Sequence, residues 1–193
     1  MEELIQLDKD LFIYLNNLGS PAWDGFWLFM TEKFYQIPLY FILLLIFYRF
    51  LGIKGTVMTL VLVALLIVTS DQLANLFKYV IFQRPRPCRA EGVADFTRFI
   101  APRCGRFGYF SGHATNSFAL AIFTILVLRK RLSFIIPLML IWAIVVSYSR
   151  IYVGVHYPLD ILTGMVVGSL LGFLAYKLHH LLLEKYSLKN EPV

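Results

Sequence analysis

The stretch from Ser149 to Asp160, SRIYVGVHYPLD, holds three ionisable side chains whose types and spacing could do chemistry. His156 and Asp160 lie four residues apart, so a helical turn between them would let the carboxylate orient the imidazole. Arg150 adds a cation whose planar set of N–H donors suits phosphate. Because ionisable groups are costly in apolar surroundings, this segment indicates a site built to attack a phosphoryl centre.

A second polar segment runs from 70 to 87 and interrupts apolar sequence in the same way. Asp71, Asn75 and Lys78 have the i, i+4, i+7 spacing of residues that share one helical face. We expect this face to point into a helix bundle or a water-filled cleft, because lipid would not solvate it. The RPRP sequence at 84–87 is predicted to end the helix, since proline removes donors and disfavours helix in the residue before it.

The third polar segment is YFSGHATNS, at 109–117, where another apolar run begins. Ser111 is predicted to be a helix N-cap, Gly112 permits a close backbone approach, and His113 then lies in the first turn. Free backbone N–H groups at a helix start bind anions. The three segments together therefore predict a cluster of catalytic and phosphate-binding groups at one membrane face.

The composition is that of an integral membrane protein in a single domain, 1–193. Of the 193 residues, 59% are hydrophobic and 16% are charged, and the mean hydropathy is +0.69. Several apolar runs approach the length of a membrane-spanning helix, about 20 residues. The fold class is predicted to be all-α, a polytopic transmembrane bundle of five to six membrane helices. The predicted crossings are 25–49, 55–82, 109–128, 132–149 and 160–182.

Three segments are expected to lie outside the crossings. Residues 1–20 alternate apolar side chains with Glu2, Asp8 and Asp10, which is typical of an amphipathic helix at the membrane interface. Residues 83–108 form an Arg-rich outer loop, and 185–193 a flexible polar tail.

The distribution of basic residues predicts the orientation of the chain. With five crossings, the basic residues of two turns and of the C-terminal end fall on one side, which the positive-inside rule makes cytoplasmic. The site would then face the periplasm or the extracellular side of the inner membrane. The net charge of +6 is explained by these edges and by the outer loop, so no nucleic acid partner is expected. The basic residues are Arg49, Lys54, Arg129, Lys130, Arg131, Lys177, Lys185 and Lys189.

The two cysteines, Cys88 and Cys104, both lie in the outer loop. In an oxidising compartment they would pair and close a loop of about 16 residues, worth about 3 kcal/mol of stability. The alternative is two free thiols.

The three segments, in this order, resemble the three signatures of the type 2 phosphatidic acid phosphatase superfamily of membrane lipid phosphatases. Those signatures are a Lys followed by Arg-Pro, a Pro-Ser-Gly-His, and Ser-Arg-x5-His-x3-Asp. The third signature is matched in full and the second departs at one position, where Phe110 replaces proline. The matching residues are Ser149, Arg150, His156 and Asp160 for the third signature, and Ser111, Gly112 and His113 for the second.

The first signature is matched more loosely. Lys78 pairs with Arg86 and Pro87, with one more intervening residue than is usual in the family. Arg84 and Pro85 offer a second, shorter pairing, so both arginines are candidates for the same role.

The resemblance implies a role for each matching residue. His156 would be the nucleophile that forms a phosphohistidine, and Asp160 would orient its imidazole. His113 would protonate the leaving oxygen and then activate water. The phosphate-binding residues would be Lys78, Arg86, Ser111, Gly112 and Arg150, with Arg84 as the alternative to Arg86.

The expected function is removal of phosphate from a lipid phosphate or diphosphate, with membrane lipids as the only other partners. Undecaprenyl diphosphate, phosphatidic acid, phosphatidylglycerophosphate and lipid A are all candidate substrates. No metal and no cofactor is expected, because histidines and carboxylates are too sparse on the outer side for a two-metal site. The alternatives are a transporter or flippase that binds the lipid without hydrolysis, and an inactive relative. No oligomeric state is predicted.

Overall fold

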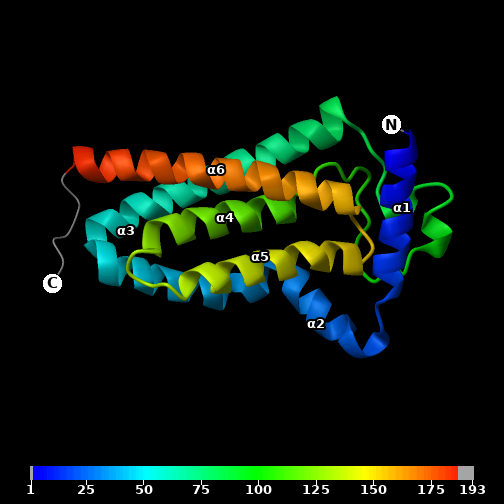
Figure 1. Cartoon of the computed structure of the whole chain (residues 1–193), viewed down its shortest axis with the longest axis horizontal. Coiled ribbons are helices and arrows are strands. Elements are labelled where there is room, and N and C mark those ends of the chain that lie inside the picture. The colour runs from blue at the N-terminus through cyan, green and yellow to red at the C-terminus, as the bar shows by residue number, and fades with distance from the viewer. Residues whose placement is uncertain (1, 187–193) are drawn as a thin grey trace.

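The computed structural model describes residues 2–186, which form a helical bundle without strands (Figure 1). Four shorter turns join the main helices: η1 (Lys33–Gln36), η2 (Phe77–Ile81), η3 (Pro87–Arg89) and η4 (Ala94–Phe96). The predicted all-α transmembrane fold is therefore confirmed. The main helices are α1 (Glu2–Asn17), α2 (Pro21–Thr31), α3 (Ile37–Leu76), α4 (Gly112–Leu128), α5 (Ile135–Tyr152) and α6 (Pro158–Lys185).

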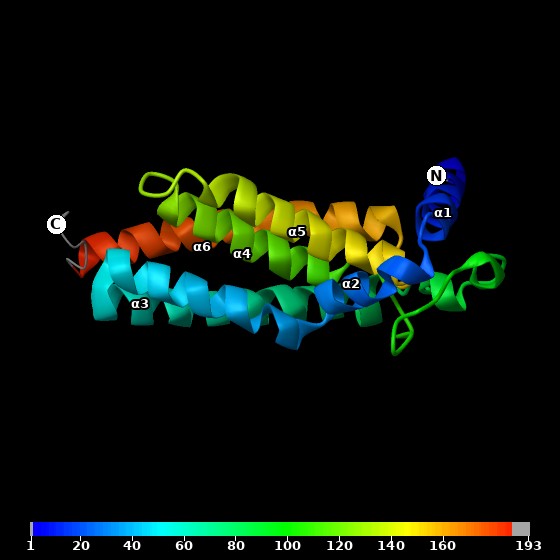
Figure 2. The same cartoon turned by 90° about the horizontal axis from the view of Figure 1, so that it is seen from below.

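Helix α3 reverses direction at Gly52, whose φ of 64° lies in a region that favours glycine. The residues before it, 37–51, form a first limb, and those after it, 53–76, a second limb that returns beside the first (Figures 1 and 2). Three segments have the length and apolarity of membrane spans: Lys33–Ile81, Ile135–Tyr152 and Pro158–Lys185. Because the first of these contains both limbs and α4 is a shorter apolar helix, residues 2–186 hold five apolar helical segments, which is the number of crossings predicted.

The bounds of these helical segments agree with the predicted crossings except at the first, which was predicted to start at 25. Residues 21–31 instead form the separate helix α2, because Glu32 has an extended backbone with φ −88° and ψ 126°. The chain re-enters a helix only after η1. At the other end, α6 includes Lys185, and the rest of the predicted tail, 187–193, lies outside the described residues.

Helix α4 occupies the centre of the bundle and packs closely on α6. The contact depends on three glycines spaced four residues apart in α6. A Cβ added to Gly164 would lie 2.7 Å from the carbonyl oxygen of Ser111, and one added to Gly168 or Gly172 would overlap the backbone of α4. Small residues permit such close approach in membrane helices. This packing brings the beginning of α4 against the beginning of α6.

Helix α1 lies across the outer end of the bundle (Figures 1 and 2). Phe12 is fully buried against Tyr157, and Asn16 donates to the backbone carbonyls of Ile151 and Tyr152 at 2.9 Å each. Asp8, predicted to lie on the polar face, is instead buried at 3% exposure. The apolar residues Leu4, Leu7 and Leu11 are the exposed ones, which suits a helix at the membrane interface.

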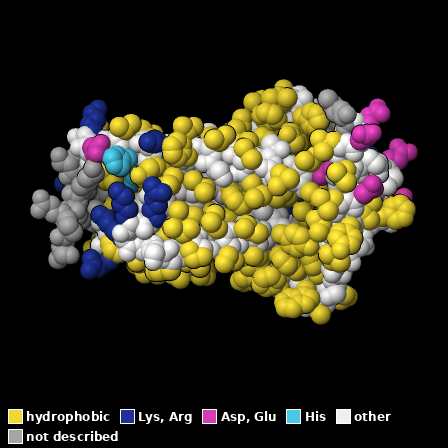
Figure 3. Space-filling model, viewed as in Figure 1, with side chains coloured by type: hydrophobic (Ala, Val, Ile, Leu, Met, Phe, Trp, Pro, Cys, Tyr) yellow, Lys and Arg dark blue, Asp and Glu magenta, His cyan; other side chains and the backbone are white. Residues whose placement is uncertain are grey.

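The face of the molecule shown in Figure 3 has the surface expected of a membrane-spanning bundle. Hydrophobic side chains cover the middle of the molecule, acidic side chains gather at the end that carries α1, and basic side chains gather at the opposite end. An apolar middle matches the hydrocarbon core of a bilayer, and the charged ends match the aqueous interfaces on its two sides. The connection 82–111 lies at the α1 end, and within it a disulfide joins Cys88 to Cys104.

Candidate active site

The three polar segments meet at one cavity of about 660 Å³ near the outer end of the bundle. Its walls come from both limbs of α3 and from α4 and α5, with the α2–η1 corner at its mouth. The cavity therefore brings together predicted site residues that are up to 78 positions apart in the sequence, from Lys78 to His156. The sequence-predicted site residues that line it are Lys78, Arg86, Gly112, His113, Arg150 and His156.

His156 lies in the turn between α5 and α6, and Asp160 lies in the first turn of α6, which begins at Pro158. The Nδ1 atom of His156 is 3.2 Å from Oδ2 of Asp160, and both side chains are buried. The same Oδ2 accepts the backbone N–H of Tyr157 at 3.1 Å. Because Nδ1 faces the carboxylate, Nε2 is the imidazole nitrogen that is free to react.

Arg84 is placed behind this pair, outside the cavity lining. Its guanidinium donates to Oδ1 of Asp160 at 3.2 Å and to Oδ2 of Asp8 at 2.7 Å, and it stacks over the ring of Tyr157 at 3.9 Å. Oδ1 of Asp8 also accepts the backbone N–H of Leu159 at 2.9 Å, near the start of α6. In this arrangement Arg84 serves the carboxylate that orients His156, whereas Arg86 is the arginine that faces the cavity.

Arg86 is fixed by the outer loop. Its Nε donates to the carbonyl oxygen of Phe107 at 2.9 Å, and a Cβ added to Gly105 would lie 3.1 Å from the same Nε. The disulfide links the two segments of chain that form this contact, because Cys88 follows Arg86 by two residues and Cys104 precedes Gly105 by one. Gly108 lies close to the His156–Asp160 pair. A Cβ added there would be 3.0 Å from Oδ2 of Asp160 and 3.5 Å from Nδ1 of His156.

The start of α4 supplies the second group of site residues. Ser111 is the N-cap, and its hydroxyl accepts the backbone N–H of Ala114 at 3.4 Å. Its side chain is fully buried and does not line the cavity. The backbone of Gly112 does line it, and an added Cβ would lie 3.5 Å from Nζ of Lys78. The first turn of α4 and a lysine ammonium thus lie together at the point where an anion would bind.

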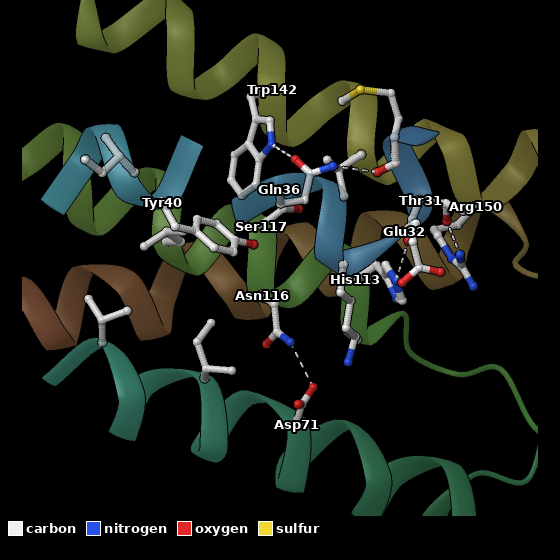
Figure 4. Close-up of a pocket in the computed structure, with 18 of the residues that line it drawn as sticks. Thr31, Glu32, Gln36, Tyr40, Asp71, His113, Asn116, Ser117, Trp142 and Arg150 are labelled. Atoms are coloured by element: carbon white, nitrogen blue, oxygen red, sulfur yellow. Dashed lines mark hydrogen bonds between the residues drawn. The ribbon is translucent and has the colours of Figure 1, made fainter. Parts of the chain in front are cut away.

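His113 and Arg150 are held by one residue, Thr31, at the end of α2 (Figure 4). Nε2 of His113 is 3.2 Å from the carbonyl oxygen of Thr31, and a guanidinium nitrogen of Arg150 bonds the Thr31 hydroxyl. Nε of Arg150 is buried without a hydrogen-bond partner. His113 and Arg150 are therefore both positioned by Thr31, a residue that the sequence analysis did not indicate.

Burial and charge set the protonation state of His156. Burial lowers its pKa well below the usual 6.5, and Arg86, Arg150, Lys78 and His113 lower it further. The imidazole is therefore neutral at pH 7, which is the form that acts as a nucleophile. Burial also lowers the pKa of Arg86, although an arginine stays charged across the physiological range.

Four residues at or beside the site were missed by sequence reasoning: Asp8, Thr31, Gly108 and Tyr157. For Asp8 a signal exists, because Asp8, Phe12 and Asn16 share one helical face, and all three are buried. Nothing in the local sequence marks the other three. No group of three or more His, Cys, Asp or Glu side chains arranged to hold a metal ion occurs among residues 2–186.

Comparison with known proteins matches the chain to the PAP2 superfamily over residues 57–183. It is 38% identical to a lipid A 4'-phosphatase of Bacteroides thetaiotaomicron, with 93% of this chain and 80% of the relative covered. It is 31% identical to an undecaprenyl-diphosphatase of Sulfolobus acidocaldarius, with 92% and 81% covered.

Among solved structures, a transmembrane PAP2-type phosphatidylglycerolphosphate phosphatase from Bacillus subtilis has the same fold. The TM-score is 0.73 at 21% identity, with 93% of this chain and 88% of that chain covered. The matched range contains His113, His156 and Asp160, together with the predicted phosphate-binding cations that line the cavity, Lys78, Arg86 and Arg150. This chain belongs to the PAP2 superfamily, as the resemblance of its three polar segments predicts.

Proposed function

We propose that this membrane lipid phosphatase transfers the phosphoryl group of its substrate to His156 and then to water. The observation that carries the proposal is the position of His156, whose Nδ1 is 3.2 Å from Asp160 and whose ring lines a cavity with three of the predicted phosphate-binding cations and a second histidine. Phosphoryl transfer depends mainly on positioning and on neutralising the charge of the phosphoryl oxygens. Lys78, Arg86 and Arg150 would supply that neutralisation.

The first half of the reaction forms a bond between Nε2 of His156 and phosphorus. The nitrogen lone pair attacks as the bond from phosphorus to the leaving oxygen breaks, and the Nδ1 proton stays hydrogen-bonded to Asp160. The leaving oxygen takes a proton from His113. Because Nε2 of His113 faces the carbonyl of Thr31, its Nδ1 is the nitrogen available for this transfer.

The second half returns the enzyme to its starting state. His113, whose Nδ1 lost its proton in the first half, takes a proton from a water molecule, and the resulting hydroxide attacks phosphorus. The bond between phosphorus and His156 breaks, its electron pair returns to Nε2, and inorganic phosphate leaves. In the second half His113 thus recovers the proton that it gave in the first half.

The shape of the cavity supports a lipid substrate. Below the cationic groups its walls are apolar and come from both limbs of α3, with Leu43, Phe47, Leu60, Val63 and Ile67 among them. Such a surface suits a hydrocarbon chain that enters from the bilayer. The similarity to a lipid A 4'-phosphatase over 93% of the chain favours a phosphorylated glycolipid over undecaprenyl diphosphate, another of the candidate substrates.

The location follows from the charge distribution. On the face shown in Figure 3, basic side chains gather at the end of the bundle opposite to the cavity, and the positive-inside rule would assign that end to the cytoplasm. The site would then face the periplasm or the extracellular side of the cytoplasmic membrane.

The test is phosphate release from a panel of lipid phosphates in detergent, with wild type compared with His156→Ala. We expect release by wild type, no release by His156→Ala, inhibition by vanadate, and unchanged turnover with EDTA. Full activity of His156→Ala would remove the proposed nucleophile, and loss of turnover with EDTA would contradict the metal-free mechanism. Uptake of intact lipid without phosphate release would favour a transporter.

A further inference from the structure

Asp71 places a carboxylate in the cavity wall, at the level where the phosphate of the substrate would bind. A Cβ added to Gly112 would lie 3.7 Å from Oδ1 of Asp71 and 3.5 Å from Nζ of Lys78, so both charged groups lie close to one point at the start of α4. A carboxylate repels phosphate, and a charge within a membrane-spanning segment is costly. The position of Asp71 therefore requires a role that outweighs both effects.

The direction of this carboxylate is fixed by the neighbouring helix. Nδ2 of Asn116 donates to Oδ1 of Asp71 at 2.8 Å, and in Figure 4 the two side chains point toward one another from α4 and α3. Asn116 follows Gly112 by about one turn of α4, so the hydrogen bond holds the carboxylate beside the first turn of that helix. The positive end of the α4 dipole and the ammonium of Lys78 both favour a negative charge there.

The ammonium of Lys78, in contrast, has no hydrogen bond to fix it. The Lys78 side chain is buried at 8% exposure, yet its ammonium donates no hydrogen bond to any of residues 2–186. The carboxylates of Asp71 and Asp160 both attract it, but Asp160 is already engaged by Arg84 and His156. Because a lysine side chain has many rotamers, a fixed charge nearby decides where its ammonium rests. Asp71 is the carboxylate that can do this.

We propose that Asp71 is a positioning residue, which holds the ammonium of Lys78 at the start of α4, ready to contact a phosphoryl oxygen of the substrate. The proposal rests on the proposed function and adds to it a residue that acts through Lys78. Charges stabilise a phosphoryl centre best when they are in place before the substrate binds. In this arrangement Asn116 fixes Asp71, and Asp71 fixes Lys78.

The test is a double-mutant cycle on the full-length protein in detergent. Asp71→Asn removes the charge but keeps an oxygen that can accept the hydrogen bond from Asn116, so the fold should persist. Lys78→Met removes the ammonium, and the double variant completes the cycle. The matched control is Asp95→Asn, which makes the same change at an exposed position of the outer loop, away from the cavity lining.

Two readouts are measured for each protein. The first is kcat/KM for the lipid phosphate of the panel that wild type hydrolyses fastest. The second is the rise in unfolding temperature caused by vanadate, which reports the binding of a phosphoryl analogue without turnover. Where Lys78→Met has no measurable turnover, the vanadate shift completes the cycle.

We expect Asp71→Asn to lower kcat/KM by about tenfold and to reduce the vanadate shift, but to change kcat/KM by less than about threefold once Lys78→Met is present. Asn116→Ala, which frees the carboxylate of Asp71, should give a smaller loss that also disappears with Lys78→Met. It tests the proposal even where Asp71→Asn does not fold. Asp95→Asn should match wild type in both readouts.

Equal losses with and without the ammonium would show that Asp71 does not act through Lys78. A gain in kcat/KM or an unchanged value for Asp71→Asn would show that the carboxylate does not assist binding or catalysis. Each of these results would overturn the proposal and leave the phosphatase intact. Failure of wild type to release phosphate from any lipid of the panel would instead overturn the proposed function.

Discussion

The guanidinium of Arg84 donates to Oδ1 of Asp160, while Oδ2 of the same carboxylate faces the imidazole of His156. The arginine is itself held by Asp8 of the N-terminal helix α1. Both Arg84 and Asp8 are nearly buried, with side-chain exposures of 14% and 2%. We conclude that α1, whose sequence suggests only a membrane anchor, also takes part in positioning the proposed nucleophile.

This relationship separates the roles of the two arginines. Arg84→Gln should lower kcat by about tenfold to hundredfold with little change in KM, because it leaves the hydrogen-bonded Asp160 without its charged partner. Arg86→Gln should instead raise KM as well, because Arg86 faces the cavity. Kinetics on one lipid phosphate would measure both. Arg84→Lys should recover part of the lost kcat, and a rise in KM alone for Arg84→Gln would show that Arg84 binds the phosphate.

The depressed pKa of His156 predicts the acid limb of the pH profile. The reactive form of His156 is the neutral imidazole, so kcat/KM is lost as the pH falls through the pKa of His156 in the folded enzyme. Because burial and nearby cations lower that pKa, the loss should occur below pH 6.5. In Arg86→Gln one of those cations is removed, and the acid limb should move to higher pH. Measuring both proteins on the same substrate removes the substrate's own titration from the comparison. An acid limb at the same pH in both proteins would contradict its assignment to His156.

The disulfide should support both stability and phosphate binding. Cys88 and Cys104 lie two residues beyond Arg86 and one residue before Gly105, which packs against the guanidinium of Arg86. Replacing both cysteines by serine should cost about 3 kcal/mol of stability and raise KM for the lipid phosphate. Thermal unfolding in detergent and steady-state kinetics measure the two effects. Reductant should reproduce them in wild type, and an unchanged KM would show that the outer loop holds Arg86 without the disulfide.

The glycines of α6 should tolerate no side chain. A methyl group at Gly168 would overlap the backbone of Thr115 in α4, so Gly168→Ala should destabilise the protein by about 1–3 kcal/mol. Gly25→Ala is the matched control, since nothing lies within 4 Å of a Cβ added there. The measurement is the unfolding temperature in detergent. Equal stability of the two variants would mean that α4 and α6 pack less closely than the structure has them.

Local sequence was enough to predict the crossings and the groups that line the outer part of the cavity. Polar residues within a short segment, such as His156 and Asp160, share a helical turn, so their proximity follows from spacing alone. The N-cap at Ser111 and the regular spacing of the three glycines in α6, Gly164, Gly168 and Gly172, are also local features of the sequence. These elements needed no knowledge of how distant segments pack.

The supporting contacts could not be predicted in the same way, because they join residues far apart in the chain. Asp8 and Arg84 are separated by 76 residues, and Thr31 and Arg150 by 119. Alternation in 1–20 placed Asp8 on the polar face, since burying a carboxylate is costly unless a cation is present. Only the fold supplies that cation. The same limit left Arg84 and Arg86 as equal candidates until their partners were known.

The central claim is that His156 carries a covalently bound phosphoryl group during the reaction. Trapping this phosphohistidine tests the claim most directly. Wild type, given lipid labelled with radioactive phosphate and quenched in alkali during turnover, should carry label on His156, because a phosphohistidine survives alkali. The His156→Ala variant should carry no label. Label on another residue, or equal label in the His156→Ala variant, would contradict the account.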